Sequence, residues 1–244
     1  MPQIIHLAST HSTNTYMRDL VETTRCDEEG TLVWSDYQTA GRGQKNNKWE
    51  SEADKNLLFT LLMQPQMIPA SEQFIISQIV SVAICDVLEQ YAEGFAIKWP
   101  NDIYYKDSKV AGILIENDLS GHILFNSYIG VGLNVNQEKF LSDAPNPISL
   151  FQITGEEIDR ESLLKQITDY MMSLYRFVVE EGEDAVKARY MDLLYRGEGF
   201  YPYRKNGVVF EAQIKSISSL GHITLEDING VEETFDFKEV EFVI

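Results

Sequence analysis

Apolar and polar residues alternate along the chain in short runs that predict strands, separated by longer stretches with helical spacing. Runs typical of strands lie at 3–7, 31–37, 56–63, 95–99, 110–115 and 123–136. Apolar residues recur at helical spacing over 71–91 and 158–181, and a shorter helix is expected over 183–195. Another helix is expected to begin at Ser12 or Thr13, which can cap it. The pattern predicts an α/β (α+β) fold.

The pattern changes near residue 197. Short alternating or apolar runs fill 208–244, and turn signals at 205–207, 220–222 and 228–230 separate them. The Asn-Gly pair in the last of these turns is a strong hairpin signal. We therefore expect a first domain over 1–196 and a small C-terminal β-barrel over 197–244.

Charged side chains are concentrated in a predicted hairpin over 97–116. The Trp99-Pro100 step and the Asp107-Ser108 step both disfavour regular structure, so strands should flank each turn. Lys109 stands where the second turn ends and a buried run begins, which is a poor place for an idle charge. A glycine inside that run, Gly112, indicates that something approaches the backbone closely, and both a ligand and a packed helix fit this pattern.

The loop over 38–49 reverses the local charge. Arg42, Lys45 and Lys48 occur there without an acid between them, and Gly41 and Gly43 free the backbone to present its N–H groups. The loop is a candidate phosphate cradle, although it lacks the Gly-Lys-Ser/Thr ending of a P-loop. An ordinary surface loop is the alternative.

The polar residues at 12–14 also allow two interpretations. They are a compact set of hydrogen-bond donors and acceptors for a polar ligand, or simply helix-capping residues, and taken alone they favour capping.

Composition narrows the functional class. The 244 residues carry a formal net charge of −18, which opposes general nucleic-acid binding because phosphates would be repelled. Cys26 and Cys85 lack metal-site spacing, the chain opens without a signal-like segment, and its apolar runs are too short to span a membrane. A cytoplasmic protein in a reducing compartment is expected.

Taken together, five stretches resemble the motifs of biotin protein ligases. They are Ser-Thr-Asn at 12–14, Gln-x-Ala-Gly-Arg-Gly at 38–43 with Trp49 closing the loop, Lys-Trp-Pro-Asn-Asp at 98–102, Lys-x-Ala-Gly-Ile-Leu-x-Glu at 109–116 and Gly-x-Gly-x-Asn at 130–134. The resemblance covers the first domain and implies a mixed central β-sheet with packed helices, followed by an SH3-like barrel. It also implies that ATP converts biotin to biotinyl-5′-AMP, and that biotin then passes to a lysine of a biotin carboxyl carrier protein or of the carrier domain of a biotin-dependent carboxylase.

The resemblance assigns roles to residues of this chain. Those expected to contact biotin are Ser12, Thr13, Asn14, Gln38, Gly41, Arg42, Gly43, Gln44, Lys109 and Gly112. Those expected to bind ATP are Arg42, Gln44, Lys45, Trp49, Lys98, Asn101, Asp102, Lys109 and Asn134. Lys109 and Arg42 are the expected catalytic residues, and Asp102 is the carboxylate expected to meet Mg²⁺.

The loop departs from the family pattern, because Gln44 stands where many members have a second arginine and Asn46 stands at a frequent glycine position. With one cation fewer in the loop, we expect either that the adenylate is retained less tightly or that Lys45 takes the role of the missing arginine. The chain begins in the first strand and lacks the helix-turn-helix that makes some members repressors, so no repressor function is expected. A monomer or a weak homodimer is expected.

Two rival functions remain open. A lipoate or octanoyl ligase would share this architecture, and a catalytically silent ligand-binding or scaffold protein would keep the fold. The Gly-Arg-Gly loop and the Lys-Trp-Pro-Asn-Asp stretch resemble biotin-type enzymes, and a scaffold would have no need of Arg42 and Lys109.

Overall fold

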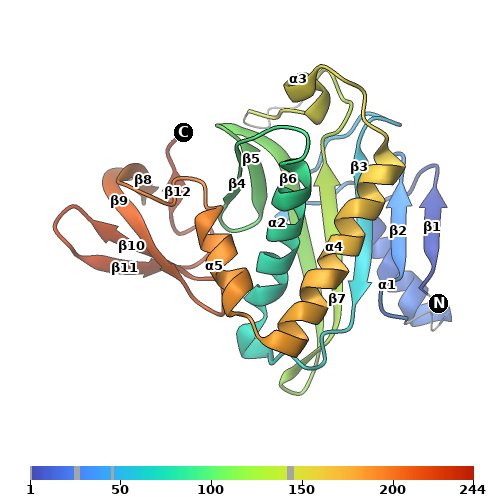
Figure 1. Cartoon of the computed structure of the whole chain (residues 1–244), viewed down its shortest axis with the longest axis horizontal. Helices are drawn as coiled ribbons and strands as arrows, with labels where there is room; N and C mark the ends of the chain where they lie inside the picture. The colour runs from blue at the N-terminus through green and yellow to red at the C-terminus, as the bar shows by residue number, and fades with distance from the viewer. Residues whose placement is uncertain (1, 25–27, 45–46, 142–145) are drawn as a thin grey trace.

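The central sheet is mixed, as expected (Figure 1). The computed structural model describes residues 2–24, 28–44, 47–141 and 146–244, and seven strands of this part pair in the order β1-β2-β3-β7-β6-β5-β4. The strands are β1 (Ile4–Leu7), β2 (Leu32–Ser35), β3 (Leu57–Met63), β4 (Phe95–Lys98), β5 (Asp102–Tyr105), β6 (Ser108–Ser120) and β7 (Ile123–Leu133). Only β1 and β2 pair in parallel among these. The predicted strands and the hairpin over 97–116 are confirmed.

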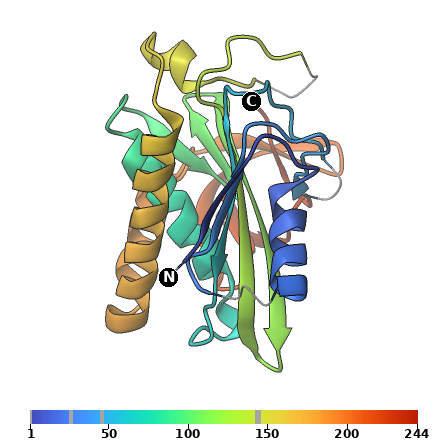
Figure 2. The same ribbon diagram turned by 90° about the vertical axis from the view of Figure 1, so that its right-hand side faces the viewer.

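Helices cover both faces of this sheet (Figure 2). The helix α1 (Thr13–Thr24) lies on one face, while α2 (Phe74–Leu88) and α4 (Arg160–Glu181) pack together on the other, followed by α5 (Asp184–Asp192). Because α2 is apolar on nearly every side, it is buried almost completely and forms the centre of the core.

Some helix predictions need correction. The helix predicted over 71–91 begins at Phe74, after the 3₁₀ turn η2 (Ala70–Glu72). The helix expected over 158–181 is α4, which begins at Arg160. The short helix α3 (Leu150–Thr154) was missed, since five residues are too few to show a helical period; Ser149 caps it and Gly155 ends it at a φ of 77°. No helix in the described ranges is both long and apolar enough to cross a bilayer.

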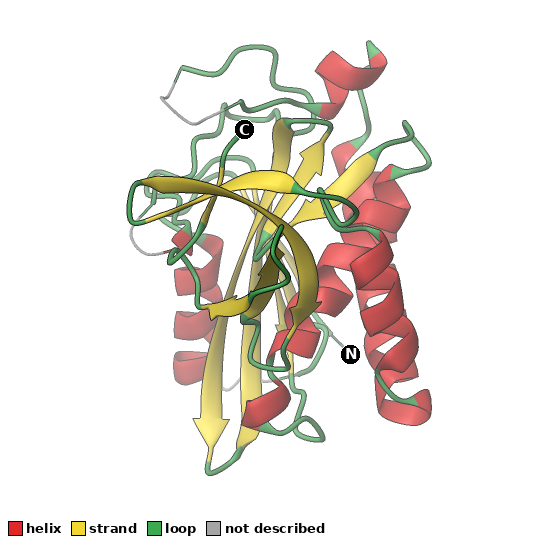
Figure 3. Cartoon of the chain, turned by 90° about the vertical axis from the view of Figure 1, so that its left-hand side faces the viewer, coloured by secondary structure: helices red, strands yellow, loops and turns green. Residues whose placement is uncertain are grey.

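The predicted barrel is found as a strongly curved antiparallel sheet (Figure 3). Five strands of the described chain pair in the order β11-β10-β9-β8-β12. They are β8 (Tyr201–Lys205), β9 (Val208–Ile217), β10 (Ile223–Asp227), β11 (Glu232–Phe235) and β12 (Glu241–Phe242). The second sheet therefore begins at Tyr201, and the domain boundary at 197 stays a prediction.

The curved sheet shares its core with the central one. Buried residues of the curved sheet, such as Tyr203 and Phe235, belong to the same apolar cluster as Phe74 of α2. At the contact, the Trp99 indole N–H donates a hydrogen bond of 2.8 Å to the Gly221 carbonyl, and its ring lies 5.5 Å from that of Phe237. Trp99 thus links the β4–β5 turn to the curved sheet.

Trp99→Phe should lower the free energy of unfolding by about 2 kcal/mol, because it removes indole volume and leaves the buried Gly221 carbonyl without its donor. Urea unfolding followed by circular dichroism measures this effect. Trp34→Phe makes the same change of volume in β2 and serves as the control. A loss below about 0.5 kcal/mol in Trp99→Phe would show that the hydrogen bond contributes nothing.

Candidate active site

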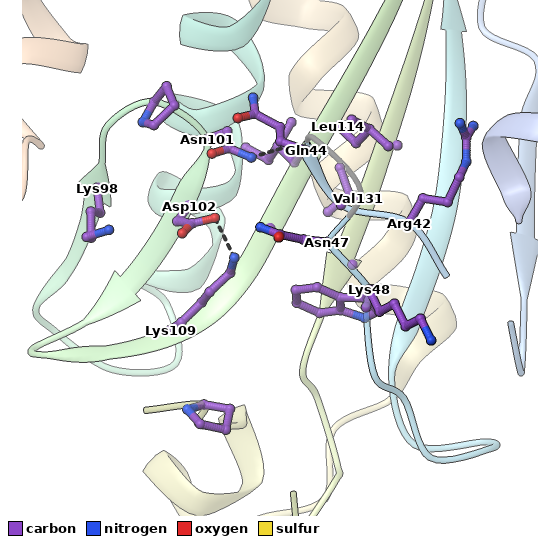
Figure 4. Close-up of a pocket in the computed structure, with 18 of the residues that line it drawn as sticks. Arg42, Gln44, Asn47, Lys48, Lys98, Asn101, Asp102, Lys109, Leu114 and Val131 are labelled. Carbon is purple, nitrogen blue, oxygen red and sulfur yellow. Dashed lines mark hydrogen bonds and ion pairs between the residues drawn. The ribbon is translucent and has the colours of Figure 1, made fainter. Parts of the chain in front are cut away.

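A cavity of about 870 Å³ opens beside β6 and β7, on the side of the central sheet that α1 covers (Figure 4). Its walls come from segments far apart in the sequence, including the start of α1, the loop after β2, the β4–β5 turn and the curved sheet. A ligand in this cavity would contact parts of the chain that only the complete fold brings together.

Most of the predicted site residues line this cavity. They are Ser12, Thr13, Asn14, Gln38, Arg42, Gly43, Gln44, Trp49, Lys98, Asn101, Asp102, Lys109, Gly112 and Asn134. Gly41 is not one of the lining residues but lies behind Trp49, whose carbonyl oxygen would be only 2.7 Å from a Cβ at position 41. Lys45 lies outside the described residues. The cavity is therefore the predicted site, while the role of each residue stays a prediction.

Lys109 forms an ion pair at one end of the cavity. Its Nζ lies 2.6 Å from an Asp102 carboxylate oxygen, and Figure 4 shows the two side chains pointing toward each other. A register shift between Ile103 and Tyr104 brings Lys109 opposite Tyr104, so β6 carries the lysine to the edge of the cavity next to β5. The Lys109 ammonium is therefore paired with a carboxylate at the cavity, which agrees with the expectation that a charge at this position in the sequence has a partner.

A second lysine makes this end of the cavity positive. Lys98 lies with its Nζ 5.1 Å from the ring centroids of both Tyr104 and Phe242. Burial lowers the pKa of the Lys98 ammonium, the Asp102 carboxylate opposes that shift, and the Lys109 ammonium adds to it. Two ammonium groups therefore share one carboxylate, which favours binding of an anion here.

Arg42 is held at another place on the cavity wall. Its guanidinium donates to both carboxylate oxygens of Glu116, at 3.2 and 2.9 Å, and Figure 4 shows its side chain directed away from Lys109. Both predicted catalytic cations line one cavity, but different carboxylates neutralise them. The sequence did not predict these two ion pairs.

The described residues between Gly41 and Trp49 are hydrogen-bonded to one another. Gly43 N–H donates to the Asn47 carbonyl at 2.7 Å, and Trp49 N–H donates to the Gly41 carbonyl at 3.0 Å. These bonds position Trp49 so that its indole packs against the sheet, where Gly112 and Gly132 lie opposite each other on β6 and β7. A Cβ at Gly112 or at Gly132 would come within 2.9 or 2.4 Å of the indole. Gly112 therefore makes room for Trp49, which neither sequence interpretation proposed.

The polar residues at the start of α1 form a buried network. The Gln38 side-chain oxygen, Oε1, accepts a hydrogen bond of 2.7 Å from the Thr13 backbone N–H, so Gln38 supplies a side-chain acceptor at this helix start. Thr60 donates to Asn14 Oδ1 at 2.6 Å, and Asn14 Nδ2 donates to Glu116 at 2.9 Å. Ser12, Thr13 and Asn14 are each at least 95% buried. Such fixed polar groups suit the recognition of a polar ligand.

Some lining residues could not be predicted. Phe237, Lys238, Val240, Glu241 and Phe242 bring the curved sheet to the cavity. Their sequence carries no motif, because what places them here is the packing of one sheet on the other. The remaining unpredicted lining residues include Asn47, Glu50, Tyr104, Phe140 and Pro147, whereas Lys48 belongs to the candidate phosphate cradle.

Comparison with known proteins agrees with this geometry. The Biotin/lipoate A/B protein ligase family model matches residues 7–134, slightly more than half of the chain. The Bifunctional ligase/repressor BirA of Bacillus subtilis (strain 168) is 31% identical over 215 residues, which are 85% of this chain but 65% of BirA. The Biotin--[acetyl-CoA-carboxylase] ligase of Paracoccus denitrificans is 33% identical over 142 residues, covering 52% of this chain and 55% of that ligase.

A solved structure shares the whole fold. The biotin protein ligase from Aquifex aeolicus in complex with biotin and ATP superposes with a TM-score of 0.81 over 100% of both chains, at 23% sequence identity. This likeness covers both the central sheet and the curved sheet. Because the family model also matches more than half of the sequence, the chain belongs to the biotin/lipoate A/B protein ligase family.

Proposed function

We propose that this protein is a biotin protein ligase, which activates biotin with ATP to biotinyl-5′-AMP and then transfers biotin to a lysine of a carrier protein. The observation that carries the proposal is a cavity in which Lys109 and Lys98 form a positive end beside a fixed polar network. The names of the Bacillus and Paracoccus relatives, and the ligands of the Aquifex structure, support it.

The first step joins two anions. The biotin carboxylate attacks the α-phosphorus of ATP, a C–O–P bond forms, and pyrophosphate leaves with the electrons of the broken P–O bond. Bringing two unit charges within 4 Å costs about 4 kcal/mol at an effective dielectric constant near 20. Lys109 would lower this cost by contacting the carboxylate and the phosphate, and Arg42 with the Gln44 N–H would stabilise the charge that develops. The Gly43 N–H would join them only after leaving the Asn47 carbonyl, to which it donates at 2.7 Å.

The polar network suits the head group of biotin. Its ureido ring needs both donors and an acceptor, which Ser12, Thr13, Asn14 and Gln38 supply. ATP would lie against Trp49, Lys98, Asn101 and Asn134. The amides of Asn101 and Asn134 already donate to the Ile113 and Ile148 carbonyls, so these two side chains are held in place before ATP binds.

The carboxylates of the cavity can hold Mg²⁺ only if the phosphates of ATP supply further oxygen ligands. In the described part of the chain, no group of three or more His, Cys, Asp or Glu residues is placed to hold a metal. Asp102 can contribute one oxygen ligand beside the phosphates, which is how proteins usually hold Mg²⁺. The ion would neutralise phosphate charge there.

In the second step, a deprotonated lysine amine of the carrier attacks the acyl carbon of the adenylate, an amide bond forms and AMP leaves. We propose a biotin carboxyl carrier protein, or the carrier domain of a biotin-dependent carboxylase, as the acceptor. A cytoplasmic location and a monomer or weak homodimer complete the proposal.

The test is ATP–pyrophosphate exchange measured with and without biotin. Exchange that depends on biotin supports the proposal, whereas exchange that depends on lipoate or octanoate instead assigns the rival activity of the same family. A protein that exchanges with none of these acids has no ligase function. Labelled biotin and purified carrier domain then report the transfer step.

Arg42→Ala should let biotinyl-5′-AMP escape about ten to a hundred times faster, since a hydrogen bond to a charged group contributes about 1.5–3 kcal/mol. The escaped adenylate would be detected as biotinylation of an unrelated bystander protein. Arg18→Ala is the matched control, because Arg18 pairs with Asp118 and does not line the cavity. Retention equal to that of the unchanged protein would remove Arg42 from the proposed site.

A further inference from the structure

Glu116 lies beside the cavity without lining it. On β6 and β7, the pairs Gly112–Gly132, Leu114–Gly130 and Glu116–Tyr128 follow one another at steps of two residues and so share a face. The Trp49 indole covers the first pair, and the Asn14 side chain lies against Gly130 of the second. Glu116 is the next position along this face, and it contacts two lining residues of the cavity, Asn14 and Arg42.

Both partners of Glu116 are proposed to touch biotin. One carboxylate oxygen, Oε2, accepts from Asn14 Nδ2 and from Arg42, each at 2.9 Å, while Oε1 accepts from Arg42 at 3.2 Å. Asn14 is fixed from its other side, because Thr60 donates to its oxygen. The Leu114 carbonyl accepts from the same Asn14 nitrogen at 3.2 Å, so Glu116, Leu114 and Thr60 together orient the Asn14 amide.

The ion pair is placed where a ligand can replace it. The Arg42 side chain is 45% exposed and the Glu116 side chain 28% exposed, and ion pairs in such positions contribute little to stability. Arg42 points away from Lys109 while it is paired (Figure 4). To reach a ligand carboxylate beside Lys109, the guanidinium must leave Glu116.

We propose that Glu116 is a positioning residue of this site, which orients the Asn14 amide and competes with the anionic ligand for the Arg42 guanidinium. The inference rests on the proposed function, because that function supplies the anion. A bound carboxylate takes Arg42 only by breaking its two hydrogen bonds to Glu116, and the affinity for biotin is reduced by that competition.

Glu116→Gln separates the two tasks, because the glutamine oxygen still accepts from Asn14 while the charge that holds Arg42 is lost. We expect KM for biotin in ATP–pyrophosphate exchange to fall by up to about fivefold, with kcat unchanged. Asp118→Asn removes one charge from the same face of β6, where Asp118 pairs with Arg18, and should leave KM unchanged. In the Arg42→Ala background, Glu116→Gln should have no further effect. An unchanged KM, or an equal fall without Arg42, would overturn the proposal.

A second measurement tests whether Glu116 holds Arg42 in the ligand-free protein, and it applies even if the protein does not activate biotin. In ligand-free protein, hydrogen exchange of the Gly43 and Trp49 amides should be several times faster in Glu116→Gln than in the unchanged protein or in Asp118→Asn. Both amides are hydrogen-bonded within the loop that Arg42 ties to β6. Equal exchange rates in the three proteins would show that Glu116 does not hold this loop.

Discussion

Lys109→Ala is expected to reduce biotin-dependent ATP–pyrophosphate exchange by about a hundredfold, a loss on the order of 3 kcal/mol of transition-state stabilisation. The ammonium of Lys109 lies 2.6 Å from Asp102 and 5.6 Å from the centroid of the Trp49 ring. Its removal leaves Lys98 alone with the Asp102 carboxylate, so this end of the cavity loses its excess positive charge. Because the reacting groups are both anions, kcat should fall more than KM rises.

Lys106→Ala is the matched control. Lys106 is an exposed residue in the β5–β6 turn, three positions before Lys109 in the sequence, and it does not line the cavity. Its replacement should leave exchange within twofold of the unchanged protein, as is usual for exposed lysines. Exchange at the normal rate in Lys109→Ala would refute the catalytic assignment.

Gly132→Ala is expected to lower kcat/KM for ATP by about a hundredfold, although the substitution adds one methyl group. The new Cβ would lie 2.4 Å from Cε2 of the Trp49 indole and 2.7 Å from its Nε1, so the ring must leave the sheet. A displacement of about 1 Å in a residue that positions substrate is enough for a loss of this size. Circular dichroism and thermal unfolding establish that the variant is folded.

The Trp49→Ala background identifies the cause. If Gly132→Ala acts by displacing the indole, it should change kcat/KM by less than about threefold in a protein that has no indole to displace. An undiminished loss in the double variant would mean that the methyl group disturbs β7 itself. Normal activity in Gly132→Ala would show that Trp49 does not position ATP.

The elements and the site could be predicted from sequence where local patterns carry the information. The seven apolar or small residues from Leu57 to Met63 predict a buried strand without any further information. Lys109 is recognisable as unusual because it is a charged residue directly before the buried run of β6. The residues of the motifs at 98–102 and 130–134 meet at one cavity because β5, β6 and β7 are adjacent in the sheet. Asn14 and Arg42, from the motifs at 12–14 and 38–43, reach the same cavity by contacts of their side chains with β6.

The other features depend on register and on packing between sheets. Gly112 lies opposite Gly132 because of the register in which β6 pairs with β7. A shift of this register by one residue would separate the two glycines against which the Trp49 indole packs. The ion pair between Arg42 and Glu116 joins residues 74 positions apart, and nothing near either one indicates the other. The wall formed by Phe237 and Phe242 likewise needs the second sheet to be docked.

The apolar cluster that runs from α2 into the curved sheet has a thermodynamic consequence. Phe74 and Tyr203 belong to this cluster, and the Trp99 indole bridges the junction, so neither sheet can melt without exposing apolar surface of the other. Calorimetry should therefore record a single endotherm whose van't Hoff enthalpy matches its measured heat. A fragment cut ahead of β8 would leave that surface in contact with water and should bind the dye ANS and aggregate.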